Sequence, residues 1–124
     1  MRTHQAECVT VTARAPDFVD ITDEIEAALA RSGIRDGHVT VFSPEDTCSI
    51  LVQERESGLL VDIEQAMDRL GAAPGRDRVA LVGSPSVVLP AVGGKLRLGV
   101  WQRVLLVELG GGRRRAVTVQ IVGE

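Results

Sequence analysis

Aromatic residues are nearly absent from this sequence. Phe18, Phe42 and Trp101 are the only three in 124 residues, and there is no Tyr. Proteins that bind single-stranded nucleic acids usually stack the bases on aromatic side chains, so this class of ligand is not expected. With so few rings, the core must be built from Val, Leu, Ile and Ala.

Cysteines and long apolar runs are also scarce. Cys8 and Cys48 are too few for a disulfide framework, so we expect two reduced thiols. The first residues lack the apolar run of a secretion signal, and no stretch approaches the roughly 20 consecutive apolar residues of a membrane helix. We therefore expect a cytoplasmic protein with no membrane partner.

An excess of positive charge is missing as well. Lys and Arg number 14 against 17 Asp and Glu, which gives a formal net charge of −3. No global basic field therefore favours binding to nucleic acid or to an anionic membrane surface. The chain does have 44% hydrophobic and 25% charged residues, as is usual for a globular protein, and its length predicts a single domain over residues 1–124.

Apolar residues at helical spacing predict two helices. The first covers residues 21–32, begins at Asp20 or Thr22 and ends at Gly33. Its apolar stripe consists of Ile21, Ile25, Ala28 and Leu29. The second covers residues 58–70 and ends at Gly71, and its stripe consists of Leu59, Ile63, Met67 and Leu70.

Period-2 alternation and β-branched residues predict six or more strands. The segments are 7–13, 38–42, 48–54, 95–102, 103–109 and 116–122, with short apolar runs at 79–83 and 86–90 and a loop at 72–78. In the last segment Val117, Val119 and Ile121 share one face. Together the segments predict an α+β fold, a mostly antiparallel sheet with two amphipathic helices.

Familiar motifs of phosphate, metal and nucleophile sites do not fit. Gly94-Lys95 is similar to the end of a P-loop, but Leu96 stands where Ser or Thr is needed. We expect His4 in a flexible start and His38 as a solvated strand residue rather than a metal ligand. A cysteine nucleophile would depend on Cys48, beside which nothing visibly lowers a thiol pKa.

The stretch from Gly110 to Arg115 has two interpretations. It is either a flexible hairpin with three solvated arginines, or an anion site. In the second case Arg113 and Arg115 point to the same face of the outgoing strand, while Arg114 faces the other way. Two guanidiniums beside glycine amides would suit a phosphate or carboxylate.

Glu108 interrupts an otherwise continuous apolar strand, "RVLLVEL". A carboxylate in that position needs a partner or an aqueous cavity, because burying an unpaired charge is costly. We therefore predict an ion pair between Glu108 and either Arg113 or Arg115, across the expected hairpin.

These segments, in this order, resemble the YjbQ family of small proteins, often described as secondary thiamine-phosphate synthase enzymes. The resemblance runs from "DITDEIEAALARSGIRDGHVTVFSP" through "SILVQERESGLLVDIEQAMDRL" to "GGKLRLGVWQRVLLVELGGGRRRAVTVQIVGE", nearly the whole chain after residue 20. The closing block is the most specific part: Leu-Gly-x-Trp-Gln, then Glu, then Arg-x-Arg.

The resemblance implies a set of site residues. Glu54 and Glu108 match the family's acidic positions and would be the catalytic acid or base. The positions implied for ligand binding are Trp101, Gln102, Arg113, Arg115 and Thr47. We expect these residues and Glu54 to cluster around one cavity, with the 45–47 turn at its rim.

The turn at residues 44–47 departs from the family pattern. The family has Pro-His-Thr-Thr, and this sequence has Pro-Glu-Asp-Thr, ending at Thr47. The segment between Leu70 and Gly83 is shorter than in the family and has none of its histidines. The resemblance implies a histidine-rich pocket, and this chain lacks those histidines.

Two functional hypotheses follow. In the first, the chain is a divergent or vestigial member whose pocket binds an anion or a metal. The cofactor would then be a divalent cation held by Glu45 and Asp46 together with Glu54. In the second, it is an enzyme of the thiamine-phosphate synthase type acting on a phosphorylated small molecule. The resemblance also implies a homotrimer, and the many aliphatic strands favour association.

Overall fold

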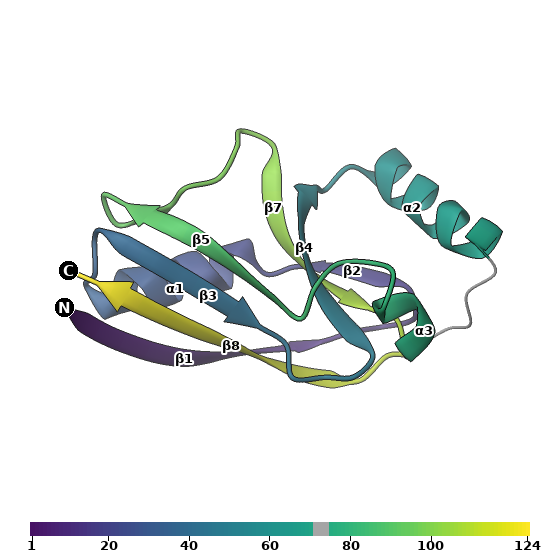
Figure 1. Cartoon of the computed structure of the whole chain (residues 1–124), viewed down its shortest axis with the longest axis horizontal. Coiled ribbons are helices and arrows are strands. Elements are labelled where there is room, and N and C mark those ends of the chain that lie inside the picture. Colours follow the sequence, from purple (N-terminus) through teal and green to yellow (C-terminus); the bar gives the residue numbers. More distant parts are fainter. Residues whose placement is uncertain (71–74) are drawn as a thin grey trace.

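Two antiparallel β-sheets form the frame of the molecule (Figure 1). The structure is a computed structural model that describes residues 1–70 and 75–124. In chain order its elements are β1 (Arg2–Val11), β2 (Asp17–Asp20), α1 (Thr22–Ser32), β3 (Gly37–Phe42), β4 (Cys48–Glu54), α2 (Ser57–Leu70), α3 (Arg76–Val79), β5 (Ser86–Val92), β6 (Lys95–Leu96), β7 (Gln102–Glu108) and β8 (Arg114–Gly123).

The larger sheet has the strand order β1-β8-β3-β5-β6, and the smaller sheet has the order β2-β7-β4. Every pair of neighbouring strands in both sheets is antiparallel. The α+β fold class with mostly antiparallel strands is therefore confirmed. Strand β8 lies between β1 and β3, so the first and last strands of the described chain are hydrogen-bonded neighbours.

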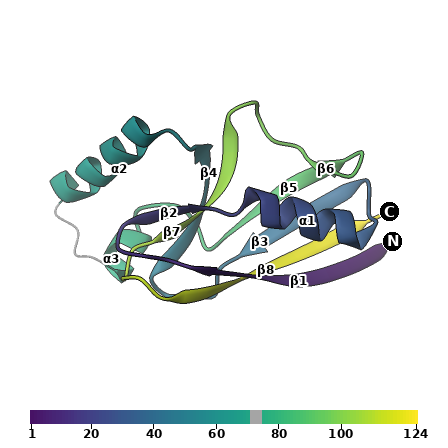
Figure 2. The same ribbon diagram turned by 180° about the vertical axis from the view of Figure 1, so that it is seen from behind.

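The main core fills the space between the larger sheet on one side and α1 with the smaller sheet on the other. Val117, Val119 and Ile121 of β8 are fully buried on the inner face of the larger sheet, as their alternation predicts. Figure 2 shows α1 lying across this face. None of the described helices covers the outer face, which is seen in front of α1 in Figure 1.

Helix α1 matches its prediction closely. Ile21, Ile25, Ala28 and Leu29 are all buried in the main core, and Gly33 ends the helix in the left-handed region with φ 71°. The carboxylate of Asp20 accepts a hydrogen bond from the backbone N–H of Thr22 at 3.0 Å. The hydroxyl of Thr22 accepts one from Val104 N at 2.8 Å, which ties the helix start to β7.

Helix α2 exists where it was expected, and its apolar face was predicted in part: Ile63 and Met67 are confirmed, but Leu60 takes the place of Leu59. Leu60, Ile63 and Met67 face a second cluster with Phe18, Val107 and Leu109, whereas Leu70 is 67% exposed. Because Leu59 and Leu60 are adjacent, the stripe could be drawn from either residue. Gly71, the expected end of the helix, lies outside the described residues.

Three strand and loop predictions were also wrong. Residues 97–101 are not a strand, because the chain turns at Gly99, whose N–H donates to the side chain of Gln102 at 2.7 Å. His4 does not lie in a flexible start, since it is paired with Ile121 in β1. Arg76–Val79 form the short helix α3 within the expected loop, of which residues 72–74 lie outside the described chain.

Strands β7 and β8 do not form a hairpin, contrary to expectation, because they belong to different sheets. Residues 109–113 instead cross from the smaller sheet to the larger one. Residues 12–16 cross between the sheets from β1 to β2, and residues 43–47 cross from β3 to β4. We call these three segments the crossovers. No helix within the described residues is both long and apolar enough to span a membrane.

Candidate functional site

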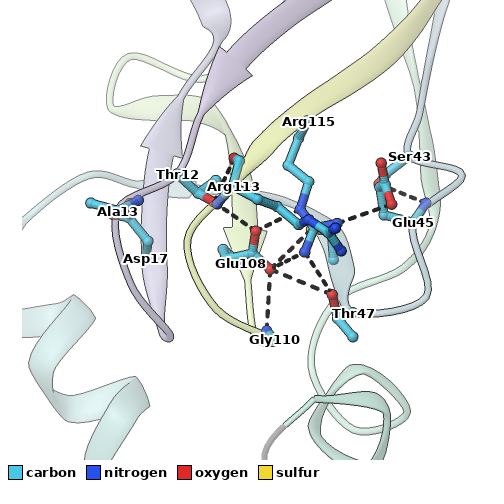
Figure 3. Close-up of polar contacts among 11 residues, drawn as sticks. Thr12, Ala13, Asp17, Ser43, Glu45, Thr47, Glu108, Gly110, Arg113 and Arg115 are labelled. Carbon is cyan, nitrogen blue, oxygen red and sulfur yellow. Dashed lines mark hydrogen bonds and ion pairs between the residues drawn. The ribbon is translucent and has the colours of Figure 1, made fainter.

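Glu108, the last residue of β7, is a charged residue with no exposure to solvent. Its carboxylate is surrounded by donors from all three crossovers (Figure 3). Oε1 accepts a hydrogen bond from the hydroxyl of Thr12 at 2.7 Å, and Oε2 accepts one from the backbone N–H of Gly110 at 3.2 Å. The hydroxyl of Thr47 and the thiol of Cys48 each lie 3.5 Å from Oε2.

Arg115, on β8, supplies the positive charge. Its Nε donates to Glu108 Oε1 at 2.6 Å and its Nη2 donates to Oε2 at 2.8 Å, a two-pronged geometry that suits guanidinium and carboxylate. The same guanidinium donates to the Glu45 carboxylate at 3.0 Å and to the Thr47 hydroxyl at 2.9 Å. The predicted ion pair of Glu108 is therefore confirmed, with Arg115 as its partner. The pair joins the two sheets.

The glycines after Glu108 let the crossovers approach one another. A Cβ on Gly110 would lie 2.5 Å from the Cβ of Thr47, and a Cβ on Gly112 would lie 2.7 Å from the backbone of Ala13. Carbon atoms cannot pack at that separation, so both positions need glycine. The stretch is thus neither of the two arrangements expected from sequence: it is a close-packed crossing between sheets.

The surroundings of Glu108 favour its ionised form. Burial alone raises the pKa of a carboxyl group, but the hydrogen bonds from Arg115, Thr12 and the Gly110 N–H outweigh this effect and lower the pKa of Glu108. An ionised carboxylate that already accepts all these hydrogen bonds is a poor proton donor or acceptor for a bound molecule.

Cys48 does not have the character of a nucleophile. Burial, followed by the negative charge of Glu108, raises the pKa of its thiol to about 12. Burial also raises the pKa of the Cys8 thiol. Both cysteines are free and buried, and at neutral pH both are protonated.

Arg113 does not share the position of Arg115. Strand β8 begins at Arg114, so Arg113 lies before it. The prediction that Arg113 and Arg115 point to the same face of one strand therefore does not apply. Its side chain is exposed and makes no ion pair with a described residue, while its backbone N–H donates to the Thr12 hydroxyl at 3.0 Å. Arg114 is exposed as well.

The remaining predicted residues lie at the opposite end of β7. Gln102 begins that strand and is paired with Glu54, the last residue of β4, whereas Cys48 is paired with Glu108. Six residue steps along a strand separate the two ends by about 20 Å. The expectation that all the predicted residues surround one cavity is therefore wrong.

A hollow of about 460 Å³ lies at this second end, and we call it the Trp101 hollow. It is lined by Asp20, Glu54, Arg55, Glu56, Val100, Trp101 and Arg103. The indole of Trp101 is 73% exposed, although a ring of this size is normally buried. Gln102 is not part of the lining.

Most charges of the Trp101 hollow already have partners. Arg103 pairs with Asp20 at 2.7 Å and with Asp23 at 3.1 Å. The carboxylate of Glu56 accepts the first N–H groups of α2, from Gly58 at 2.9 Å and Leu59 at 2.7 Å, and the hydrogen bond from Gly58 is the largest cause of its lowered pKa.

Two side chains of the hollow are not engaged in this way. The carboxylate of Glu54 and the guanidinium of Arg55 form no ion pair and no side-chain hydrogen bond with any described residue. One negative and one positive group are therefore available beside an exposed indole.

The three carboxylates expected to hold a metal do not converge. We call Glu108, Arg115, Thr12, Thr47 and Glu45 the Glu108 cluster. Within it Glu45 faces Arg115, and Asp46 is exposed on the same crossover. Glu54 lies at the other end of β4. Within the described part of the chain, no group of three or more His, Cys, Asp or Glu has a geometry suited to a metal ion. The residues present do not fit a divalent cation.

Sequence reasoning missed Thr12 and Arg55. Thr12 falls within the predicted strand 7–13, where it looks like an ordinary β-branched strand residue. Nothing in the sequence indicated that its hydroxyl donates a hydrogen bond to Glu108. Arg55 could have been noticed, because it stands between Glu54 and Glu56 just before a helix with no acidic residue in its first turn.

Comparison with known proteins gives a consistent result. A family model described as "UPF0047 protein YjbQ-like" matches residues 7–124. A UPF0047 protein of Archaeoglobus fulgidus is 38% identical over 127 residues, which cover 92% of this chain and 98% of that protein. Another, from Methanothermobacter thermautotrophicus, is 33% identical and covers 100% of this chain and 95% of its own length.

Solved structures show the same fold. The crystal structure of a YbjQ-like protein of unknown function from Sulfolobus solfataricus has a TM-score of 0.88 and 31% identity, covering 99% of both chains. An uncharacterised conserved protein of the YjbQ/UPF0047 family from Clostridium acetobutylicum has a TM-score of 0.86 and 29% identity, covering 94% of this chain and 99% of its own.

Proposed function

The chain belongs to the UPF0047 protein YjbQ-like family, and we propose that it is a divergent member that binds a small anionic ligand in the Trp101 hollow. The ligand class is a planar ring compound that carries a phosphate or a carboxylate. The observation that carries this proposal is the combination of an exposed indole with an unengaged carboxylate and guanidinium in one hollow.

Each part of the ligand has a matching group in the hollow. A planar ring stacks on the indole of Trp101, and such stacking is favourable for any aromatic system. The guanidinium of Arg55 binds the oxyanion by charge-assisted hydrogen bonds. The carboxylate of Glu54 accepts hydrogen bonds from ring N–H or amino groups.

The Glu108 cluster is a less suitable ligand site than the Trp101 hollow. Arg115 already makes four hydrogen bonds to Glu108, Glu45 and Thr47, so its guanidinium has little left for a ligand. We therefore assign Glu108, Arg115 and Thr47 a structural role. Trp101 keeps the ligand-binding role that the resemblance implies, whereas Glu54, implied there as a catalytic acid or base, takes a ligand-binding role in this proposal.

An enzymatic function of the thiamine-phosphate synthase type is the second candidate. It is favoured by the position of Glu54, an exposed carboxylate beside the indole, where it can serve as a general acid or base. In this case turnover of a phosphorylated substrate depends on Glu54 and is unaffected by Glu108→Gln in any variant that remains folded.

Fluorescence offers a direct test, because Trp101 is the sole tryptophan. Thiamine monophosphate should quench its emission saturably, and inorganic phosphate should compete weakly. Arg55→Gln should weaken binding about tenfold, the loss expected for a charge-assisted hydrogen bond. The matched control is Arg114→Gln, an exposed arginine outside the hollow. Absence of saturation, or equal weakening by both variants, would contradict the proposal.

We also propose that the protein is a homotrimer and acts in the cytoplasm. Exposed apolar side chains on the outer face of the larger sheet support association: Val9, Val11, Phe42, Val88 and Val92. The free thiols suit a reducing compartment. Light scattering should give three times the 13.3 kDa chain mass. The mass of a single chain would refute the trimer.

A further inference from the structure

A second hollow, of about 320 Å³, lies where α1 ends and β5 turns into β6, and we call it the Gly94 hollow. It is lined by Leu29, Ala30, Gly33, Ile34, Arg35, Gly93, Gly94 and Lys95. Figure 2 shows this region beside the two chain termini, away from the crossovers. It shares no lining residue with the Trp101 hollow.

The charged residues of this lining are both cations. Arg35 and Lys95 are exposed, and neither side chain forms an ion pair or hydrogen bond with another described residue. The backbone N–H groups of the turn are already used: Gly93 donates to the Asp36 carboxylate at 3.1 Å, and Gly94 donates to the Arg35 carbonyl at 2.9 Å. The donors left for a ligand are the two cationic side chains.

The turn leaves the guanidinium of Arg35 uncovered. Gly93 and Gly94 have φ 60° and 82°, values that favour glycine, so no side chain projects from either residue. A Cβ on Gly94 would lie 3.5 Å from Arg35 Nη1, and one on Gly93 would lie 4.0 Å from Nη2. The guanidinium thus lies against the bare turn.

The negative end of the α1 dipole is partly offset beside the hollow. The last carbonyls of a helix carry partial negative charge, but in this structure those of Leu29, Ala30 and Ser32 accept hydrogen bonds. Arg2 donates to the carbonyl of Gly33 at 2.8 Å and to that of Ser32 at 3.4 Å. The Ser32 hydroxyl donates to the carbonyl of Leu29 at 2.6 Å. Arg2 also adds a third positive charge at the edge of the hollow.

Nearby carboxylates are engaged elsewhere. Asp36 accepts from the Gly93 N–H, Glu26 accepts from the Leu96 N–H at 3.3 Å, and Glu124 pairs with the amino group of Met1. None of the three lines the hollow. Its deeper wall is apolar and comes from Leu29, Ala30 and Ile34.

We propose that the Gly94 hollow binds an oxyanion, a carboxylate or a phosphate monoester, carried on a small apolar group. Arg35 and Lys95 bind the oxyanion, and the apolar group packs on Leu29 and Ile34. This site is separate from the Trp101 hollow, and the inference does not depend on the proposed function.

The test is an NMR titration of the ¹⁵N-labelled protein with hexanoate, hexyl phosphate and inorganic phosphate. Saturable shifts are expected for the amides of Gly33, Gly93 and Lys95 with the first two probes. The tighter of them identifies the preferred oxyanion. Inorganic phosphate should bind about tenfold more weakly, because it has no apolar group. Hexylammonium, of the same length and opposite charge, should not bind.

Three variants connect the shifts to the site. Lys95→Gln and Arg35→Gln should each weaken hexanoate binding about tenfold. Arg97→Gln is the matched control, since Arg97 is an exposed cation just after the same turn but outside the hollow. Trp101→Ala should leave these shifts intact, which separates this site from the proposed ligand site. Equal weakening by Arg97→Gln, no saturation, or equal binding of hexylammonium would overturn the inference.

Discussion

The two ends of β7 contain similar residues in opposite states. At its last residue, Glu108 is fully buried and accepts hydrogen bonds from Arg115, Thr12 and Gly110. At its first residue, the neighbouring Glu54 and Arg55 are exposed and have no partner among the described residues. The charge of Glu108 is therefore paired within the protein, whereas the charges of Glu54 and Arg55 are exposed to solvent.

This difference separates stability from function along one strand. A buried charge must be paired, so loss of one partner at the Glu108 end should be costly, and the hydrogen bonds made there leave little for a ligand. The Trp101 end is exposed, and in the proposed function it carries the groups that recognise a ligand. The predictions below test this division, in order of decreasing effect on stability.

The largest loss should come from removing the positive charge at the buried end. Arg115→Met leaves Glu108 buried and unpaired, and we expect the free energy of unfolding to fall by about 3–5 kcal/mol in urea denaturation followed by circular dichroism. The control Arg114→Met removes an exposed neighbour and should change stability by less than about 0.5 kcal/mol. A similar small change in both would show that the pair does not hold the sheets together.

The next effect should come from the crossing itself. Gly110→Ala forces a Cβ against Thr47, and such overpacking typically costs about 1–3 kcal/mol. Gly58→Ala, in the first turn of α2, meets only the side chain of Glu56 at 3.1 Å and should be neutral or slightly stabilising. If Gly110→Ala is also neutral by urea denaturation, the crossovers are less tightly packed than the structure indicates.

Acid should weaken the buried end. The pKa of Glu108 is lowered in the folded protein, so as the pH falls below the ordinary value of 4.5 the unfolded chain takes up the proton first. Unfolding is thereby favoured, and stability is lost as the pH approaches the lower folded pKa. Urea midpoints measured between pH 7 and pH 3 should fall more steeply for the natural protein than for Glu108→Gln. Parallel slopes would mean that other carboxyl groups, such as Asp20, dominate.

The smallest change in stability should come from the open end. Trp101→Ala should alter the free energy of unfolding by less than about 0.5 kcal/mol, because the ring is mostly exposed. The same variant should lose binding of thiamine monophosphate, measured by calorimetry since the fluorophore is gone. A large loss of stability would return Trp101 to a structural role and end the contrast between the two ends.

The sequence predicted the elements better than their contacts. The apolar stripe of α1 and the alternation of β8 were sufficient to predict which residues are buried. Each is a local pattern, and each element packs one face on the main core. The face of α2 was right at Ile63 and Met67 but wrong at its start, since Leu59 and Leu60 fit the period equally well and only packing on the second cluster selects between them. The segment after Leu96 alternates like a strand, yet the turn at Gly99 interrupts it.

The site was predictable in part for a similar reason. A carboxylate inside "RVLLVEL" predicts a cationic partner on energetic grounds alone, and Arg115 is that partner. What the sequence did not contain was the assignment of β7 and β8 to different sheets. That crossing replaces the expected hairpin. The antiparallel pairing of β4 with β7 places Glu54 beside Gln102, at the opposite end of β7 from Glu108, so the expected pocket is two separate regions.

The pairing of β8 between β1 and β3 also determines when the larger sheet can form during synthesis. Strands β1 and β3 have no hydrogen bonds to each other, and both use β8 as their neighbour. A ribosome must therefore complete residues 114–123 before the first strand finds its place, and Arg115 arrives in the same segment to neutralise Glu108. Until then the nascent chain presents unpaired strand edges, so the larger sheet cannot be completed before its interior strand β8 has been synthesised.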